Sequence, residues 1–408
     1  MMFKNAKLAT LFFTMMVMMI GFGIIIPIMP FYIQSFGASG SQLGVMMAIF
    51  SLAQFISSPF WGSLSDRFGR KRIMMIGVLG NAISLIVIGF AQSFWVILVS
   101  RALEGLLSSA TLPTAMAYIS DSTSEEDRGG GMGVIGAAMG VGMVLGPGIG
   151  GLFAANDLSH PFFIAAGLSL MCVLLIWFIL PESLPVEKRL KTVGRLRGVQ
   201  PAVLWKALTG HMGFLFFLAF LVNFALANFE GIFGLYAGKN YGYGPAQVGT
   251  VLMVVGVVSS LVQALLTGPA TRRLGEAAVI KITLLASALG FVFMVLVTDN
   301  ALVVLSVGFF VFCNAMLRPS IISLTSKMSG REQGMTLGLN NSFQSLGRAV
   351  GPLWAGFTFD YNLHIPYLSA AFILVAAFFF ALRTMPSGQV LTNQPPPTLS
   401  PDIQSREI

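Results

Sequence analysis

Two glutamates that lie inside long apolar runs are the residues of this chain best suited to proton transfer. Glu230 lies in the run from residue 213 to 237, and Glu104 lies in the run from residue 94 to 119. Charged groups are costly in an apolar surrounding, so an ionisable residue found there indicates a functional role. A carboxyl group can take up a proton in one state of a protein and release it in another. We therefore predict that Glu230 couples the protein to protons, with Glu104 as the second candidate.

A static ion pair is the alternative for both glutamates. Arg101 lies three positions before Glu104, so the two share one face of a helix and are close enough to pair. Glu230 has no basic neighbour on its own helix, but it could pair with Arg318 or Arg348 across the interior and merely hold the helices together. We favour proton coupling for Glu230, whereas for Glu104 a static pair and a proton relay are equally open.

Polar residues inside other apolar runs form the predicted substrate cavity. Asn340, Gln344 and Arg348 recur at steps of four, which places them on one helix face, directed toward the interior. Phe233 follows Glu230 by three positions and shares its face, so we expect it to contact the substrate. The predicted cavity residues are Gln54, Arg101, Asn223, Phe233, Asn314, Arg318, Asn341, Gln344 and Arg348.

The composition is that of a membrane protein. Of the 408 residues, 55% are hydrophobic and 10% are charged, whereas a soluble domain carries roughly 25% charged residues. The apolar runs approach or exceed the ~20 residues that an α-helix needs to cross a bilayer, and they are too long for the strands of a β-barrel. Cys172 and Cys313 both lie in such runs, so no disulfide framework or metal site is expected. The first run continues to Phe31 without a cleavage site, which indicates a retained helix and not a signal peptide.

The chain is predicted to be all-α, with twelve membrane-spanning helices. Basic residues crowd into alternate connections, whereas the opposite set of connections holds Lys239 alone. Short loops rich in Lys and Arg stay in the cytoplasm, so both termini are expected there. The net charge of +8 is then a matter of topology and not a nucleic-acid footprint. The predicted spans are Leu8–Phe31, Gln42–Leu64, Ile73–Ala91, Phe94–Ile119, Gly131–Ala154, Pro161–Leu180, Gly213–Ala237, Gln247–Gly268, Ala277–Val297, Ala301–Leu324, Met335–Phe357 and Tyr367–Leu382.

A polar linker and an internal repeat divide the chain into two halves. The only long polar stretch inside the chain is Pro181–Lys206, so we predict bundles over residues 1–181 and 207–384, joined by a linker over 182–206. Residues 385–408 are rich in Pro, Ser, Thr and Gln, which predicts a disordered tail. Motifs of the first half recur about 205 positions later: Gly62, Arg67 and Gly69 match Gly268, Arg273 and Gly275, and Gly146, Pro147 and Gly151 match Gly351, Pro352 and Gly356.

Two glycine-containing motifs are predicted to control movement of the halves. Gly62–Arg72 has five charged residues within seven positions between two apolar runs, which makes it a tight connection at a membrane face. Topology alone would explain its arginines but not Asp66, which can pair with Arg70. Glycines in the run 131–154 allow close helix approach and Pro147 bends the helix, so this segment is either a pivot or tight packing. The predicted gating residues are Gly62, Asp66, Arg67, Gly69, Arg70, Gly142, Gly146, Pro147 and Gly151.

These motifs resemble those of the major facilitator superfamily. Gly62–Arg72 resembles its signature loop between helices 2 and 3. Arg101 with Gly105, Gly142–Gly151 and Gly21–Pro30 resemble motifs of its drug:proton antiporter branch, which includes multidrug and tetracycline exporters. The resemblance implies two pseudo-symmetric six-helix bundles around a substrate site at the midplane, and transport driven by the proton gradient without a cofactor. It also implies that Asp66 and Arg67 latch the two halves on the cytoplasmic side when the cavity faces outward.

Two departures from the multidrug pattern concern charge. Relatives in this branch often carry an acid where Ala315 stands, and some carry one in the first helix, which here has none. Within the spans we count three arginines, Arg101, Arg318 and Arg348, against two glutamates. This balance argues against permanent cations as the main substrates and leaves neutral, zwitterionic and anionic amphiphiles open.

The sequence therefore predicts a proton-coupled exporter of hydrophobic or amphiphilic small molecules, such as drugs, that works by alternating access and confers antibiotic resistance. We expect it in the inner or plasma membrane, as a monomer, with the substrate, protons and the lipid bilayer as partners and no nucleic acid. The alternatives are an importer or facilitator of a small metabolite, and a lipid flippase or non-transporting scaffold of the same fold. The sequence has no nucleotide-binding loop and no nucleophile–base set, so an enzyme is not expected.

Overall fold

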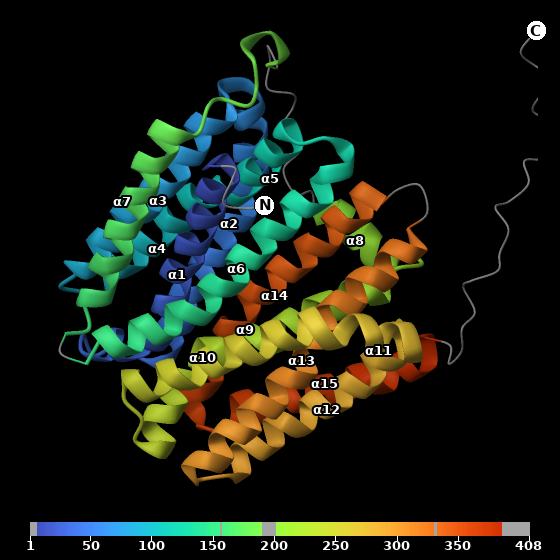
Figure 1. Ribbon diagram of the computed structural model, residues 1–408. Helices are drawn as coiled ribbons and strands as arrows, with labels where there is room; N and C mark the ends of the chain where they lie inside the picture. Colours follow the sequence, from blue (N-terminus) through green and yellow to red (C-terminus); the bar gives the residue numbers. More distant parts are fainter. Residues whose placement is uncertain (1–5, 156, 190–200, 330–332, 386–408) are drawn as a thin grey trace, which may run out of the picture.

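The computed structural model describes residues 6–155, 157–189, 201–329 and 333–385, and these residues are almost entirely helical (Figure 1). The first half contains α1 (Ala6–Gln34), α2 (Gly40–Phe68), α3 (Arg70–Gly89), α4 (Phe94–Ser108), α5 (Thr111–Ser122), α6 (Glu125–Phe153) and α7 (His160–Ile179). A 3₁₀ turn, η2 (Val186–Lys188), follows. The second half contains α8 (Pro201–Thr209), α9 (Gly213–Tyr241), α10 (Pro245–Leu261), the π-helical turn η3 (Val262–Leu266), α11 (Thr267–Leu274), α12 (Glu276–Leu296), α13 (Asn300–Met328), α14 (Gln333–Tyr361) and α15 (Ile365–Thr384).

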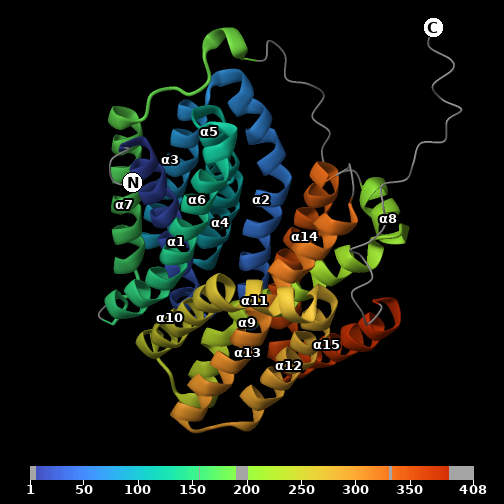
Figure 2. The same ribbon diagram turned by 45° about the vertical axis from the view of Figure 1, so that its right-hand side comes forward.

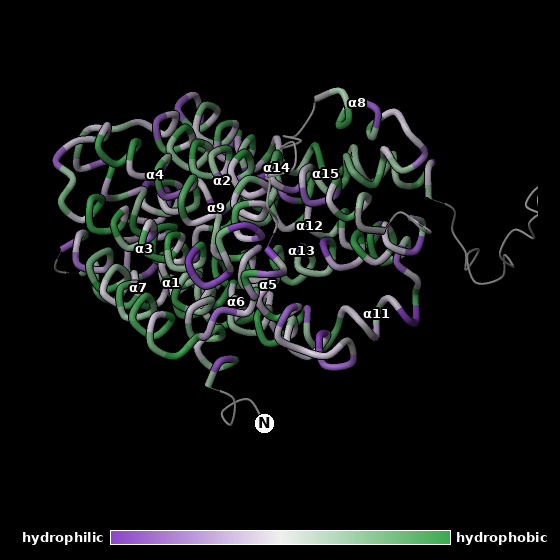
Figure 3. Tube along the Cα trace, turned by 90° about the horizontal axis from the view of Figure 1, so that it is seen from above, coloured by the Kyte–Doolittle hydropathy of each residue, from purple (hydrophilic) through white to green (hydrophobic). Residues whose placement is uncertain are grey.

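The predicted spans coincide with the observed helices. Within the described ranges, eleven segments are long and apolar enough to cross a membrane, with α4 and α5 forming one segment and α10, η3 and α11 another. The remaining long helix, α14, has 29 residues, and its amides and Arg348 interrupt its apolar run. With α14, the twelve predicted positions are all helical, and most helices extend a few residues beyond the predicted ends. Figure 3 shows that the helices of both bundles are mostly hydrophobic.

The helices form two bundles that meet along two helix pairs. Helices α1–α7 make the first bundle and α9–α15 the second, and the bundles pack against each other through α2 with α14 and through α6 with α10 (Figures 1 and 2). The chain crosses the bundles alternately from one side to the other. We call the side with Ala6, Gly69 and Thr384 the termini side, and the side with Ser39 and Asp299 the distal side.

Glycines bring α6 close to a helix of each bundle. A Cβ atom added at Gly142 would lie 2.4 Å from the Met16 carbonyl oxygen of α1, and one added at Gly146 would lie 2.8 Å from the Gly23 Cα atom. On another face of α6, a Cβ atom at Gly151 would lie 2.9 Å from the Pro245 carbonyl oxygen at the start of α10. The close helix approach predicted for this run is present on two faces of α6, because it packs against its own bundle and against the other one.

The second half repeats this arrangement in α14. A Cβ atom at Gly351 would lie 2.6 Å from the Phe224 carbonyl oxygen of α9, within the same bundle. Gly356 faces the first bundle, where an added Cβ atom would meet the Gly40 carbonyl oxygen of α2. The loop glycines Gly69 and Gly275 also match, with φ angles of 100° and 79° that favour glycine. The predicted internal repeat is therefore confirmed in the helix contacts as well as in the loop.

The bundles touch on the distal side and diverge on the termini side (Figure 2). The close contacts of Gly40 and Gly151 with the opposite bundle both lie near the distal end. On the termini side, Cβ atoms added at Gly62, Gly129, Gly130, Gly133, Gly136 and Gly338 would meet no atom within 4 Å. The structure is thus a conformation that is closed distally and open toward the termini side.

The boundaries of the halves differ slightly from the prediction. Helix α8 begins at Pro201, inside the predicted linker, and proline is compatible with a first helical turn because its missing N–H group would have no partner there. Met385, assigned to the tail, is buried, and its carbonyl oxygen accepts a hydrogen bond from Lys281 Nζ (2.5 Å). The rest of the predicted linker, residues 190–200, and the tail from residue 386 lie outside the described residues.

Lys281 corrects the charge count made from the sequence. It lies inside the predicted span 277–297, yet that count left it out. The side chain is buried on α12, and its ammonium group reaches the end of α15 on the termini side. Long basic side chains near helix ends reach the membrane boundary in this way. The positive excess within the spans is therefore larger than three arginines against two glutamates.

Candidate functional site

The connection between α2 and α3 is held by ion pairs within the first bundle. Arg70 Nη1 lies 2.6 Å from Asp66 Oδ1, and Arg70 Nε donates a hydrogen bond to Asp121 Oδ2 (3.0 Å). Arg70 Nη1 also donates to Ser65 Oγ (2.6 Å). The predicted pairing of Asp66 with Arg70 is therefore present. Arg67 points elsewhere and stacks on the Phe68 ring at 5.1 Å, so neither Asp66 nor Arg67 pairs with a described residue of the second bundle in this conformation.

Glu182 explains why Gly69 is needed at this connection. The Arg70 backbone N–H donates to Glu182 Oε1 (2.8 Å), so this carboxylate binds the start of α3, where the helix dipole favours an anion. A Cβ atom at Gly69 would lie only 2.2 Å from Glu182 Oε2. Sequence reasoning missed both Glu182 and Asp121. Each lies next to the end of an apolar run on the termini side, which was the available signal, but the run ends do not tell which helices are neighbours.

Arg101 and Glu104 form a buried ion pair inside the first bundle. Arg101 Nη1 lies 2.7 Å from Glu104 Oε2, and both residues are almost completely buried. The guanidinium group also lies 4.0 Å from the centre of the Phe50 ring of α2, a cation–π contact. Gly105 permits this approach, because a Cβ atom there would lie 2.4 Å from the Phe50 carbonyl oxygen. Gln54, one turn further along α2, is half-buried.

Glu230 makes no ion pair in this conformation. It is half-buried on α9, and no basic nitrogen of the described residues lies within 4.0 Å of its carboxylate. Arg348 of α14 is its electrostatic neighbour, and Arg348 Nη2 donates a hydrogen bond to Ser345 Oγ (2.9 Å). Arg318 of α13 is exposed and is the electrostatic neighbour of Arg348 in turn. The three charged residues thus face a common interior without a direct contact between Glu230 and either arginine.

The amide stripe of α14 lies between helices. Gln344 Nε2 donates to Asn340 Oδ1 (2.5 Å), and Asn340 Nδ2 donates to Thr325 Oγ1 of α13 (3.3 Å). Asn340 and Gln344 are each 1% exposed. The stripe therefore faces the bundle interior as predicted, but its amides join α14 to α13. Such inter-helix hydrogen bonds stabilise helix packing in apolar surroundings.

The other predicted cavity residues have different positions. Asn223 is buried and donates to the Ala219 carbonyl oxygen (2.9 Å), whereas the amide nitrogen of the buried Asn314 has no hydrogen-bond partner among the described residues. Asn341 is exposed. Phe233 is fully buried against Phe229, with 5.0 Å between ring centres. Asn223 and Phe233 thus belong to the packed interior of the second bundle in this conformation.

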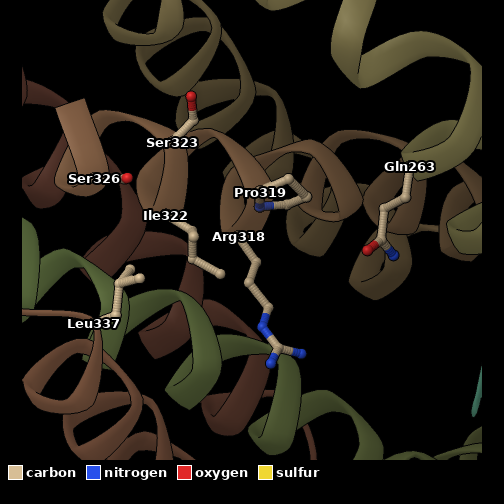
Figure 4. Close-up of a pocket in the computed structure, with 7 residues that line it drawn as sticks. All are labelled: Gln263, Arg318, Pro319, Ile322, Ser323, Ser326 and Leu337. Carbon is tan, nitrogen blue, oxygen red and sulfur yellow. The ribbon is translucent and has the colours of Figure 1, made fainter. Parts of the chain in front are cut away.

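An open pocket of about 540 Å³ lies on the termini-side half of the second bundle. Figure 4 shows Arg318 extending into it from α13, with Gln263 across the open space. The π-helical turn η3 carries Gln263, and such turns occur frequently at functional sites. The lining residues are Gln263, Arg318, Pro319, Ile322, Ser323, Ser326 and Leu337. Of the predicted cavity residues, only Arg318 lines this pocket. Gln263 was missed, although it lies inside a predicted apolar run as Gln54 does, and that position was the available signal.

Asp360 joins the two bundles on the distal side. This carboxylate, at the end of α14, accepts hydrogen bonds from the Gly40 N–H (2.9 Å) and the Ser41 N–H (2.8 Å) at the start of α2, and from the Ser41 hydroxyl group. The N-terminal end of a helix carries partial positive charge and free N–H groups, which suit an anion. This contact could not be predicted, because its partners are more than 300 positions apart in the chain.

Comparisons with known proteins agree with this architecture. The Major Facilitator Superfamily profile matches residues 11–352 and 215–404. Multidrug resistance protein 2 of Bacillus subtilis (strain 168) is 33% identical over 361 residues, which cover 87% of this chain and 89% of that protein. The quinolone resistance protein NorA of Staphylococcus aureus (strain COL) is 29% identical over 93% of this chain and 96% of its own length.

Solved structures show the same fold. A variant of the nucleoside transporter NupG superposes with a TM-score of 0.79 at 17% identity, covering 94% of this chain and 100% of that one. The human organic anion transporter MFSD10 gives a TM-score of 0.67 at 23% identity, covering 92% of this chain and 99% of that one. At such low identity these two structures bear on the fold alone.

Proposed function

The chain belongs to the major facilitator superfamily, and on this premise we propose that it exports hydrophobic or amphiphilic small molecules, drugs among them, in exchange for protons. It is a multi-pass membrane transporter and not an enzyme. The similarity to proteins named for multidrug and quinolone resistance supports drugs as the substrate class. The twelve predicted spans and the repeated bundles support alternating access, in which the two halves rock around a site between them.

The observation that supports proton coupling is that the interior carboxylate of Glu230 makes no ion pair with a described residue. Glu230 is the one acidic side chain within the interior of the second bundle, in the part of the chain that the structure describes. Because it makes no ion pair, its protonation would change the charge facing Arg348 without breaking a salt bridge. A change of conformation that alters the access of water to a carboxyl group alters its affinity for protons. Glu230 is therefore suited to bind a proton in one conformation and release it in the other.

The open side is compatible with the export direction. Placing both termini in the cytoplasm, as the distribution of basic residues favours, turns the open termini side toward the cytoplasm, where an exporter collects its substrate. Asp66 pairs with Arg70 within its own bundle in this open conformation. This pairing is consistent with a latch that engages the second bundle only when the termini side closes.

Transport in sealed vesicles tests the proposal. The purified protein is reconstituted in liposomes, and a fluorescent drug is followed with an imposed pH gradient, without one, and after the gradient is collapsed by an ionophore. A proton-coupled exporter accumulates the drug only while the gradient lasts. A facilitator equilibrates the drug regardless of the gradient, and a scaffold moves none. Accumulation that is indifferent to the gradient would exclude proton coupling.

A further inference from the structure

Arg318 is an unpaired cation in a pocket. It lies in the middle of α13, a membrane-crossing helix, yet it is exposed and has no hydrogen bond or ion pair with any described residue. Figure 4 shows its guanidinium group at the far end of a side chain that reaches into the open space. A charged side chain inside a membrane protein is costly and normally pairs with an opposite charge. No acidic side chain of the described ranges supplies such a partner for Arg318.

The surrounding charges leave the pocket positive. Arg348, the electrostatic neighbour of Arg318, has the same sign. Glu276 reaches the pocket wall by accepting a hydrogen bond from Ser323 (2.9 Å), but it is already in an ion pair with Lys327. Glu230 neighbours Arg348, and it makes no ion pair with either arginine. Among the described residues, this region thus holds two arginines and one carboxylate without an ion pair, that of Glu230.

The walls of the pocket suit an amphiphile. Pro319, Ile322 and Leu337 give it an apolar side. The Gln263 amide nitrogen is already bound to Ser259 Oγ (2.9 Å) and the Ser323 hydroxyl group to Glu276, so Arg318 remains the strongest free donor. A guanidinium group binds carboxylates and sulfonates through two parallel hydrogen bonds. A volume of about 540 Å³ lies in the range of small-molecule sites, roughly 300–1,000 Å³.

We propose that Arg318 binds the anionic group of amphiphilic substrates, so that this transporter prefers carboxylates and sulfonates to neutral or permanently cationic analogues. The apolar body of the substrate rests against Ile322 and Leu337, and Gln263 closes the opposite wall. That anionic amphiphiles are transported rests on the proposed export function. The binding preference is a property of the pocket itself and is measured without a gradient.

The test compares three probes that share one fluorophore. Dansyl-leucine is an anion, dansyl-leucine amide is neutral and dansyl-cadaverine is a cation. Binding to the full-length purified protein is measured by fluorescence. We expect dansyl-leucine to bind most tightly, by roughly ten- to a hundredfold over the amide, as one charge-assisted contact provides. Arg318→Gln removes this preference, and Arg318→Lys retains part of it because the charge remains.

A matched control separates the pocket from the overall charge. Arg383→Gln removes one positive charge from an exposed position near the end of α15, and it should leave the order of the three probes unchanged. Gln263→Glu places an acid on the exposed pocket wall opposite Arg318 and should abolish the preference even where Arg318→Gln folds poorly. The proposal is overturned if the wild type binds dansyl-cadaverine as tightly as dansyl-leucine, or if Gln263→Glu or a folded Arg318→Gln keeps the preference.

Failure of the proposed function gives a different result. In that case the protein would bind dansyl-leucine with the expected preference but would not accumulate it in vesicles with a pH gradient. Failure of the anion site gives accumulation driven by the gradient with no preference for the anionic probe.

Discussion

The carboxylate of Asp360, at the end of α14, accepts hydrogen bonds from the backbone N–H and the hydroxyl group of Ser41 at the start of α2. One carboxylate thus fastens the second bundle to the first on the distal side, while the bundles stand apart on the termini side. The ion pair of Asp66 on the termini side stays within one bundle. The conformation is therefore held at one end only, and the residues at each end provide separate means of shifting it.

Replacing Asp360 with Asn should shift the protein toward conformations that are open on the distal side. The substitution removes the charge that faces the start of α2, a contact worth about 1–2 kcal/mol, or roughly a five- to thirtyfold change in the ratio of states. Spin labels on cysteines introduced at the exposed distal positions Gln92 and Asn300 would report a longer distance. Asp157→Asn changes a distal carboxylate whose contacts with described residues lie in its own bundle, and it should leave the distance unchanged. Equal distances in the Asp360 variant and the wild type would contradict the prediction.

Asp66→Asn should leave the protein folded but slow its transport. Arg70 keeps Asp121 and Ser65 as partners, so its buried guanidinium group does not lose all its acceptors when the half-exposed Asp66 carboxylate is replaced. The loss should instead appear in the rate of drug movement into vesicles, at equal amounts of inserted protein. Asp127→Asn, an exposed acid on the same side, is the control. Transport at the wild-type rate would argue against a latch role for Asp66.

Changing Arg101 or Glu104 alone should lower the yield of folded protein. Either change leaves one charge buried without its partner, at a cost of about 3–5 kcal/mol, and loss of Arg101 also removes the contact with Phe50. The double variant, Arg101→Met with Glu104→Gln, should recover much of the folded protein, as measured by thermal unfolding in detergent. A double variant that is stable but inactive would favour the relay role for Glu104.

Glu230→Gln should abolish accumulation against a gradient but preserve passive exchange. The amide mimics the protonated carboxyl group, so no proton can leave at this position. Antiport of protons and substrate requires that protonation of Glu230 shifts the protein to a conformation that binds the substrate more weakly. Substrate binding to the wild type should therefore fall as the pH falls. Binding to the variant should lose this dependence. Glu126→Gln, the same change at an exposed position, serves as the control; a folded Glu230→Gln protein that still drives accumulation would move coupling to Glu104.

Ala315→Asp should reverse the preference of the Arg318 pocket. Ala315 lies three positions before Arg318 on α13, so an aspartate there can pair with the guanidinium group. The anionic probe dansyl-leucine should lose its advantage, and the cationic probe dansyl-cadaverine should gain affinity. Ala315→Asn has nearly the same volume without the charge and should keep the anion preference. An aspartate variant that binds the three probes like the asparagine variant would contradict this explanation.

The sequence predicted what depends on local patterns. The position of each span follows from its own apolar run, and the match of Gly146 and Pro147 to Gly351 and Pro352 revealed the repeat before any contact was known. Partners from distant parts of the chain were not predictable. The apolar runs place Asp121 and Glu182 on the termini side, but the choice of Arg70 as their common neighbour depends on how the helices pack.

Inside the bundles, too, contacts between residues that are distant in the sequence were not predictable. The four-residue spacing of Asn340 and Gln344 predicted the correct helix face. The spacing could not show that the Asn340 amide donates a hydrogen bond to the Thr325 hydroxyl group. Phe233 shares a helix face with Glu230, but it does not face the pocket. Other helices cover most of the circumference of α9. Lys281 was overlooked because it lies one turn inside an otherwise apolar run.

The unpacked glycines on the termini-side half of α6 offer a way to trap one conformation. A methyl group at Gly133 or Gly136 meets no neighbour in the present state, and replacing glycine with alanine in a helix also reduces the conformational freedom of the unfolded chain. The same methyl groups would obstruct any closure that brings another helix against this surface. A set of alanines here would therefore yield a stabilised protein held open on the termini side, a suitable target for selecting antibodies or inhibitors that recognise this state alone.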